Sequence, residues 1–200
     1  MPASPNAHPV PPADALPPRE RILAAAADLF YRQGIRAVGV EAVAEAAGTN
    51  KMTLYRHFAS KDVLVAEYLR LEAQEAEAQW THLEGRHPGE PLAQLRAWFR
   101  DVTAHVASES ERGCALSNAA IELPDEEHPA RAVIKTHKTF TRKRIAALAR
   151  AAGLHEPALL ADELFLLLEG ARVTAQSVGR EGLGARLLRM GEAMIAAHRD

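Results

Sequence analysis

Residues 38–61, which read VGVEAVAEAAGTNKMTLYRHFASK, decide the fold of this chain. A run of about eight helix-forming residues is followed by Gly48 and then by a second short helix, which is the spacing of a helix-turn-helix motif. We expect Gly48 to adopt the left-handed conformation at the turn, and Asn50 or Thr49 to cap the second helix. A small apolar core would hold the two helices at a fixed angle, and its expected members are Val43, Ala47, Leu54 and Phe58.

The second helix of this motif has an unusual charge. Residues 46–61 contain no acidic residue, although Asp and Glu make up 26 of the 200 residues of the chain. The same segment contains Lys51, Arg56 and Lys61, and this local positive charge favours a polyanion as partner. The pattern leaves one alternative open, a short solvated helix pair without any ligand.

Outward from the motif, the composition predicts an all-α chain with about nine helices. From Arg19 onwards the sequence is rich in Ala, Leu, Glu and Arg, which favour helices, and no window alternates apolar and polar residues as a strand would. The first helix carries Ile22 and ends at Gly34. Glycine and proline turns place the others at about 40–47, 50–57, 61 into the eighties, 91–107, 114–122, 128–152, 157–178 and 184–198.

The remaining features of the composition bear on the cellular compartment of the protein. Residues 1–18 contain seven of the twelve prolines, which predicts a disordered leader. A single cysteine excludes an intramolecular disulfide framework. The chain begins without the basic and apolar regions of a signal peptide, and no apolar run reaches the ~18 residues of a membrane helix. We therefore expect a cytoplasmic protein that makes no membrane contact.

Enzymatic signatures are missing from the sequence. The nine histidines form no His-Glu-x-x-His motif, and neither Cys-x-x-Cys nor Gly-x-Ser-x-Gly occurs. We therefore expect no catalytic residue, no metal site and no cofactor, and we interpret the chain as a binding protein rather than an enzyme. A purely structural helical adaptor is the other possibility, but it leaves the acid-free motif unexplained.

Three segments together resemble the N-terminal DNA-binding domain of the TetR/AcrR family of repressors. They are 40–48 (VEAVAEAAG), 53–58 (TLYRHF) and 60–64 (SKDVL), preceded by a first helix at 21–30 (RILAAAADLF). The resemblance implies a helix-turn-helix DNA-binding domain at 19–65, after the leader at 1–18, and an effector-binding and dimerisation domain at 66–200. It further implies a homodimeric repressor that binds an inverted repeat in double-stranded DNA and is released by a small-molecule effector of unknown identity.

The resemblance also assigns roles within the motif. It implies that Lys51 and Met52 contact base edges in the major groove. The residues that it places on the DNA backbone are Val40, Thr49, Thr53, Tyr55, His57 and Lys61. The remaining positions of the recognition helix are Asn50, Leu54, Arg56 and Phe58. Glu41 departs from the pattern, because some relatives have a basic residue there; a carboxylate would accept a hydrogen bond from cytosine or stay solvated.

The C-terminal part is expected to pair two copies of the chain and to hold the effector. The apolar faces that we expect to serve both the core and the partner are Leu160, Leu164, Leu167, Leu168 and Ala171, then Leu183, Leu187, Leu188 and Ile195. The candidates for an effector pocket are Trp98, His105, Cys114, Asn118, His137 and Phe140, since aromatic side chains with a few polar groups suit a small amphipathic ligand. Each of these six residues is also compatible with an ordinary core or surface position.

Two other regulatory schemes remain open from the sequence. The chain could be a ligand-independent DNA binder or an activator that uses the same helix-turn-helix. It could also be a thiol-based redox sensor, because Cys114 stands at an expected helix N-terminus near Arg112, where the pKa of a thiol falls.

Overall fold

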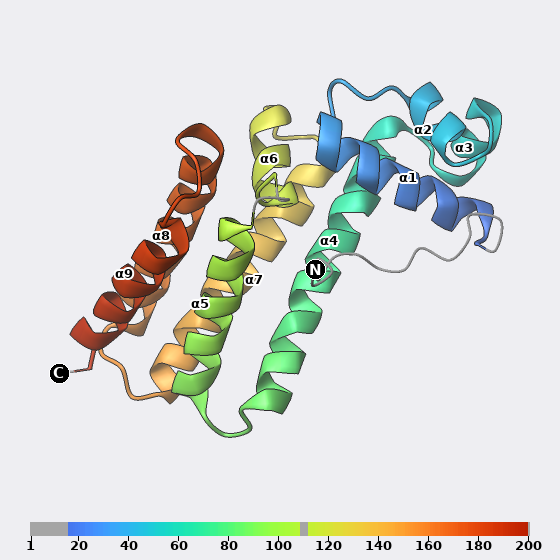
Figure 1. Cartoon of the computed structure of the whole chain (residues 1–200). Coiled ribbons are helices and arrows are strands. Elements are labelled where there is room, and N and C mark those ends of the chain that lie inside the picture. Colours follow the sequence, from blue (N-terminus) through green and yellow to red (C-terminus); the bar gives the residue numbers. More distant parts are fainter. Residues whose placement is uncertain (1–15, 109–111, 200) are drawn as a thin grey trace.

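The computed structural model describes residues 16–108 and 112–199, and within these ranges the chain consists of nine helices and no strand (Figure 1). The all-α prediction is therefore confirmed. The bounds are α1 Pro18–Gln33, α2 Val40–Ala46, α3 Lys51–His57, α4 Lys61–Arg86, α5 Pro91–Ala107, α6 Ala115–Glu122, α7 Pro129–Ala151, α8 Pro157–Ser177 and α9 Leu183–Ala197. The expected disordered leader lies, over residues 1–15, outside the described residues. Pro18, the last residue of the expected leader, opens α1, a position at which proline is favoured.

The N-terminal part folds as the motif predicts. Gly48 has a φ of +62°, and the side chain of Asn50 accepts a hydrogen bond from the backbone N–H of Thr53 at 2.9 Å. This bond decides between the two capping candidates in favour of Asn50. The four expected core residues, Val43, Ala47, Leu54 and Phe58, are all buried. Together these contacts fix α3 against α2 and leave its other side on the surface.

The helix α4 joins the N-terminal part to a bundle made of α5, α7, α8 and α9 (Figure 1). In the bundle the rings of Trp80 and Trp98 stack with centroids 5.2 Å apart and an angle of 14° between their planes. They belong to a core that also takes in Leu95, Ile145 and Leu164. The helices α8 and α9 form one outer edge of the bundle, and among the described helices none covers the outer side of this pair.

The short helix α6 connects the two parts of the molecule. Its residues Leu116 and Ala119 pack in the same core as Ile22 of α1 and Leu64 of α4. In the sequence, α6 lies far into the region expected to form a separate effector domain. The N-terminal helices and the bundle therefore share packed side chains and are not joined by a linker.

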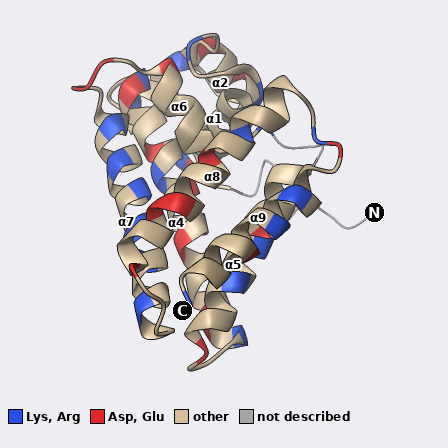
Figure 2. Cartoon of the chain, turned by 90° about the vertical axis from the view of Figure 1, so that its left-hand side faces the viewer, with Lys and Arg blue, Asp and Glu red and all other residues tan. Residues whose placement is uncertain are grey.

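Three of the seven Lys and Arg residues of α7 form ion pairs within the chain. Figure 2 shows Lys and Arg residues spread along this helix. Three of them contact acidic side chains: Lys138 with Glu169, Arg142 with Asp162, and Arg144 with Glu84. The charge of these three residues is therefore offset locally. Across the described ranges, none of the helices combines the length and the apolar character that crossing a membrane requires.

Candidate nucleic-acid interface

The helix α3 presents a basic and polar surface on a buried apolar anchor. Leu54 has no exposed side chain, whereas Met52 is 77% exposed and Lys51, Arg56 and His57 are also exposed. A seven-residue helix has little intrinsic stability, so the packing of Leu54 and the Asn50 cap hold it in place. The exposed face is a rigid platform of suitable size for the major groove of DNA.

Lys51 is held between two neighbouring side chains. Its Nζ lies 2.6 Å from Oε1 of Glu41 on α2 and 5.9 Å from the ring centroid of Tyr55. The hydrogen bond between the two charged groups lowers the pKa of Glu41 and raises the pKa of Lys51, so both are ionised near neutral pH. The expected base-reading lysine is therefore paired with a carboxylate on the same surface.

The residues expected to contact the DNA backbone have different surroundings. Tyr55 and His57 are exposed, and Thr49 and Thr53 are half-buried. The remaining two, Val40 and Lys61, stand at the N-termini of α2 and α4, where backbone N–H groups favour an anion.

Lys61 differs from the expectation in one respect. Its Nζ donates a hydrogen bond of 2.6 Å to the backbone carbonyl of Ile35 and lies 5.9 Å from the ring centroid of Phe30. The ammonium thus ties α4 to the segment after α1. A phosphate contact by the ammonium would have to replace that hydrogen bond. At the start of α4, the Ser60 hydroxyl accepts from the backbone N–H of Val63.

The six candidate effector residues do not line one common cavity in the described structure. Trp98 is stacked on Trp80 in the core, Phe140 is partly exposed, and His105 is half-buried. His137 is buried, and its Nδ1 has no hydrogen-bond partner among the described residues. Burial and the positive charges of Lys138 and Arg172 lower the pKa of His137 to about 4, so its ring is neutral near pH 7.

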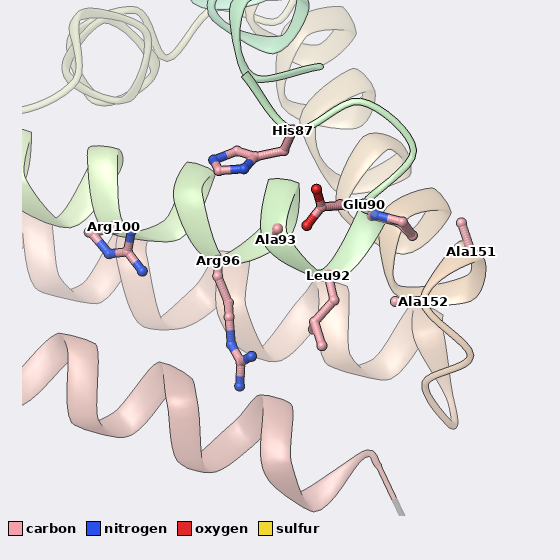
Figure 3. Close-up of a pocket in the computed structure, with 9 residues that line it drawn as sticks. His87, Glu90, Leu92, Ala93, Arg96, Arg100, Ala151 and Ala152 are labelled. Carbon is pink, nitrogen blue, oxygen red and sulfur yellow. The ribbon is translucent and has the colours of Figure 1, made fainter. Parts of the chain in front are cut away.

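The described part of the chain includes a wide groove and a much smaller cavity. The larger, with a volume of about 560 Å³, is an open groove at the turn between α4 and α5 (Figure 3). His87 and Glu90 lie over this groove, and Arg96 extends toward α9, where it contacts Glu192. The smaller, of about 10 Å³, lies between α1, α4 and α6, and Asn118 is the one effector candidate that lines it. A site of that size holds no more than a water molecule.

Cys114 and two further residues form a polar cluster with Lys138. Lys138 Nζ lies 3.8 Å from Cys114 Sγ, 2.7 Å from the hydroxyl of Ser117 and 2.7 Å from Oε1 of Glu169. Arg172 also contacts Glu169. Burial raises the pKa of the Cys114 thiol, but the charges of Arg172 and Lys138 and the hydrogen bonds from Ser117 outweigh it, and the pKa lies below its usual value.

A set of hydrogen bonds ties the other side of α6 to α1. The hydroxyl of Tyr31 donates to the carbonyl of Gly113 and accepts from the backbone N–H of Arg112, at 3.1 and 2.8 Å. The carboxylate of Glu122 accepts from the backbone N–H of Arg36 at 3.0 Å. Sequence reasoning missed these residues, because they lie up to 86 positions apart and belong to no local motif. The same holds for Ser117 and Glu169.

The described residues offer no cofactor or metal site of the usual kind. In residues 16–108 and 112–199, no three His, Cys, Asp or Glu side chains lie close enough together to hold a metal ion. The candidate functional features are therefore the exposed face of α3 and the small polar clusters around α6.

Comparison with known proteins identifies the motif. Residues 22–68 match the sequence model of the bacterial regulatory proteins of the tetR family. The chain is 30% identical over 94 residues to the HTH-type transcriptional regulator AcrR of Shigella flexneri, a match that covers 47% of this chain and 44% of that protein. It is 34% identical over 110 residues to the HTH-type transcriptional repressor KstR2 of Mycobacterium tuberculosis, covering 55% and 46% respectively. The chain thus matches less than half the length of these curated relatives.

Solved structures extend the similarity over nearly the whole chain. A TetR-family transcriptional regulator from Streptomyces coelicolor is 29% identical, with a TM-score of 0.85 over 92% of this chain and 96% of that one. A TetR transcriptional regulator from Streptomyces avermitilis is 33% identical, with a TM-score of 0.78 over 92% of this chain and 98% of that one. The likeness therefore includes the bundle as well as the helix-turn-helix. This chain belongs to the TetR family of bacterial transcriptional regulators.

Proposed function

We propose that the chain is a repressor that binds double-stranded DNA at an inverted repeat. The observation that carries the proposal is the acid-free, exposed face of α3 on its buried Leu54 anchor. Lys51 suits the O6 and N7 acceptors of guanine, and Met52 suits a thymine methyl group. Thr49, Thr53, Tyr55 and the N-terminus of α4 would contact phosphates on either side and set the register. The similarity to KstR2, which is named a repressor, supports the sign of regulation.

We propose further that two copies pair through α8 and α9. Leu159, Leu166 and Val173 are exposed at intervals of seven residues along α8, the spacing of a helix-packing seam. Their helix belongs to the outer edge of the bundle in Figure 1, and their exposure shows that the described part of the chain leaves them largely uncovered. In a two-fold dimer, both copies would contribute these three side chains to the interface. The dimer would present two copies of α3 to two half-sites about 34 Å apart.

This stripe differs from the faces expected from the sequence, whose members Leu167 and Leu188 are half-buried and stay candidates for the interface. Leu160 and Leu164 of the expected face are fully buried inside the chain's own core, as are Leu187 and Ile195 of the second face. An apolar periodicity shows that a helix has a packing face, but it does not show whether the neighbour is the same chain or another. We therefore assign to the interface the apolar residues of α8 that remain exposed outside the core.

For release from DNA, we propose that a small molecule acts on the bundle through α6. One side of this helix contributes Ser117 to the cluster with Lys138 and Glu169, and its flanking loop holds Tyr31 of α1. A ligand that binds differently to two positions of α6 would shift the balance between two positions of the DNA-binding helices. The effector residues predicted from the sequence, with His137 and Asn118 as the polar members, stay candidates for this site.

The Cys114 cluster favours one second candidate, a repressor that responds to thiol chemistry. The supporting observation is the 3.8 Å contact with Lys138, because a neighbouring cation stabilises the reactive thiolate. The test is iodoacetamide labelling of the native protein followed by an operator-binding assay. Loss of DNA binding in the wild type but not in Cys114→Ser supports this scheme. Equal DNA binding by labelled and unlabelled protein contradicts it.

The experiment that tests the main proposal is selection of bound sites from a random duplex pool by the purified protein. Enrichment of one inverted repeat supports a dimeric repressor that reads sequence. Binding that depends on salt but enriches no repeat contradicts the proposal, because phosphate contacts alone carry no sequence information. The selected repeat then provides the probe for ligand-induced release, which distinguishes a regulated repressor from a ligand-independent DNA binder.

A further inference from the structure

The pair formed by Glu41 and Lys51 occupies the DNA-facing surface and joins the two helices of the motif. Glu41 is the second residue of α2 and Lys51 the first residue of α3, and the Nζ–Oε1 distance is 2.6 Å. Both side chains are largely exposed, at 67% and 55% respectively, so the pair is not part of the core. The Lys51 ammonium also lies over the ring of Tyr55, 5.9 Å from its centroid. A donor and an acceptor are thus presented to solvent next to each other.

One base pair offers the complementary arrangement in the major groove. Guanine presents the N7 and O6 acceptors, and its cytosine partner presents the N4 amino donor beside O6. Guanine O6 and cytosine N4 are joined by a Watson–Crick hydrogen bond, so these two atoms lie about 2.9 Å apart. The separation of the Lys51 and Glu41 polar atoms is close to this value. The pair therefore fits the edge of a single G·C base pair without having to separate.

We propose that Glu41 is a specificity-determining residue that reads one G·C base pair of each half-site together with Lys51. In this arrangement, which rests on the proposed DNA-binding function, Lys51 Nζ donates to O6 and N7 of guanine, and Glu41 accepts from N4 of the paired cytosine. The carboxylate keeps the ammonium in position for this contact. Glu41 is thereby a reading residue and not a solvated replacement for the basic residue of some relatives.

The pair discriminates against the alternatives by hydrogen-bond count and by charge. At an A·T pair, the adenine edge has one acceptor, N7, beside the N6 donor, so Lys51 loses one of its two acceptors. With the pair reversed, the carboxylate faces guanine O6 or N7, two acceptors that repel it. A lysine without this carboxylate would tolerate such changes better, because its ammonium can move to any nearby acceptor.

The carboxylate has a second consequence for DNA of unrelated sequence. Away from its cognate base pair, Glu41 adds a negative charge close to the phosphates and offsets the charge of Lys51. Binding that depends on phosphate contacts is weakened by this offset. Glu41 therefore strengthens binding to the operator and weakens binding to other DNA, and both effects raise specificity.

The experiment compares site selection and non-specific binding for four proteins: the wild type, Glu41→Gln, Lys51→Ala and Glu45→Gln. Glu45 is the matched control, since it is an exposed acid one turn further along α2. We expect the wild type to select G·C at one position of each half-site. At that position alone, Glu41→Gln should lose about tenfold in preference and gain adenine, because a glutamine amide pairs with adenine N6 and N7. Glu45→Gln should select the wild-type site.

Binding to a random duplex, followed by salt titration, gives the second readout. Glu41→Gln should bind this duplex several-fold more tightly than the wild type, and its log Kd against log salt slope should steepen by about one unit, as for one further phosphate contact. Glu45→Gln should change this binding less, because its carboxylate does not neutralise Lys51.

The outcomes separate this inference from the function on which it rests. If the wild type selects an inverted repeat and Glu41→Gln selects the same one with the same G·C preference, Glu41 does not read the base pair. If Glu41→Gln and Lys51→Ala relax different positions, the two residues do not act as a unit, and the inference is also wrong. If the wild type selects no repeat, it is the proposed DNA-reading function that fails, and the inference falls with it.

Discussion

Replacement of Leu166 by serine should separate the two copies of the proposed dimer. Leu166 is 68% exposed in the single chain. Complete burial of a leucine side chain contributes about 1.5–3 kcal/mol, so covering the exposed two-thirds would contribute about 1–2 kcal/mol. A two-fold interface contains the residue twice, which makes the expected loss about 2–4 kcal/mol, or about 30- to 700-fold in the Kd of the dimer. The fold itself should keep its stability, because the side chain lies outside the core.

Sedimentation equilibrium of the wild type and of Leu166→Ser measures this directly. The control is Ile121→Ser, which removes an aliphatic side chain of similar exposure, 77%, from α6. We expect a dimer for the wild type and for Ile121→Ser, and a largely weakened dimer for Leu166→Ser. A wild-type chain that is monomeric at micromolar concentration would refute the reasoning. The same dimer Kd for all three proteins would refute it too, because the exposed stripe would then not be the interface.

Three further predictions concern stability. Leu54→Ala should cost about 2–5 kcal/mol in denaturant unfolding by opening a cavity under α3, and Met52→Ala about 0.5 or less; equal losses would contradict the anchor role of Leu54. Tyr31→Phe removes two hydrogen bonds to the loop before α6 and should cost about 1–3 kcal/mol in the same assay, so an unchanged unfolding midpoint would argue against a stabilising role of these two bonds. The ring of His198 contacts the Glu163 carboxylate and a backbone carbonyl, which together overcome burial and raise its pKa. A raised pKa stabilises the folded chain most below the ordinary histidine pKa of about 6.5, and this contribution is lost as pH rises through the higher, folded-state value. His198→Gln should therefore flatten the pH dependence of Tm above about pH 6.5, and an identical profile would contradict the contact.

Much of the fold follows from local chemistry and was therefore predictable. Gly48 takes a positive φ that other residues rarely adopt, and the Asn50 side chain accepts from the backbone N–H of Thr53, which has no partner within the helix. Such signals act within a few residues, so the sequence shows them directly. A small error remains at one helix end: Cys114 was expected as the first residue of its helix and is the cap residue that precedes it.

The candidate site was predictable only in part. The exposure of its residues follows from local sequence, whereas their contacts join residues on different helices. The exposed positions of α3 repeat with the helical period, and the buried Leu54 determines which side of the helix faces the core. The contact between Lys51 and Glu41 instead depends on the angle between α2 and α3, which is set by packing. The cluster of Cys114 with Lys138 and Glu169 requires three helices to meet, and the spacing of these residues in the sequence carries no sign of it.

The position of α6 bears on how regulation can work in this molecule. A division of the chain after residue 65 falls inside the continuous helix α4, and Leu116 and Ala119 of α6 share a core with the N-terminal helices. Because packed interiors resist gradual deformation, α6 cannot shift without also displacing the residues of α1 that contact it. A ligand in the bundle would therefore act on DNA binding through the repacking of one short helix. The strength of regulation would then depend on how differently the ligand binds the two packings of α6, and not on how tightly it binds to either one.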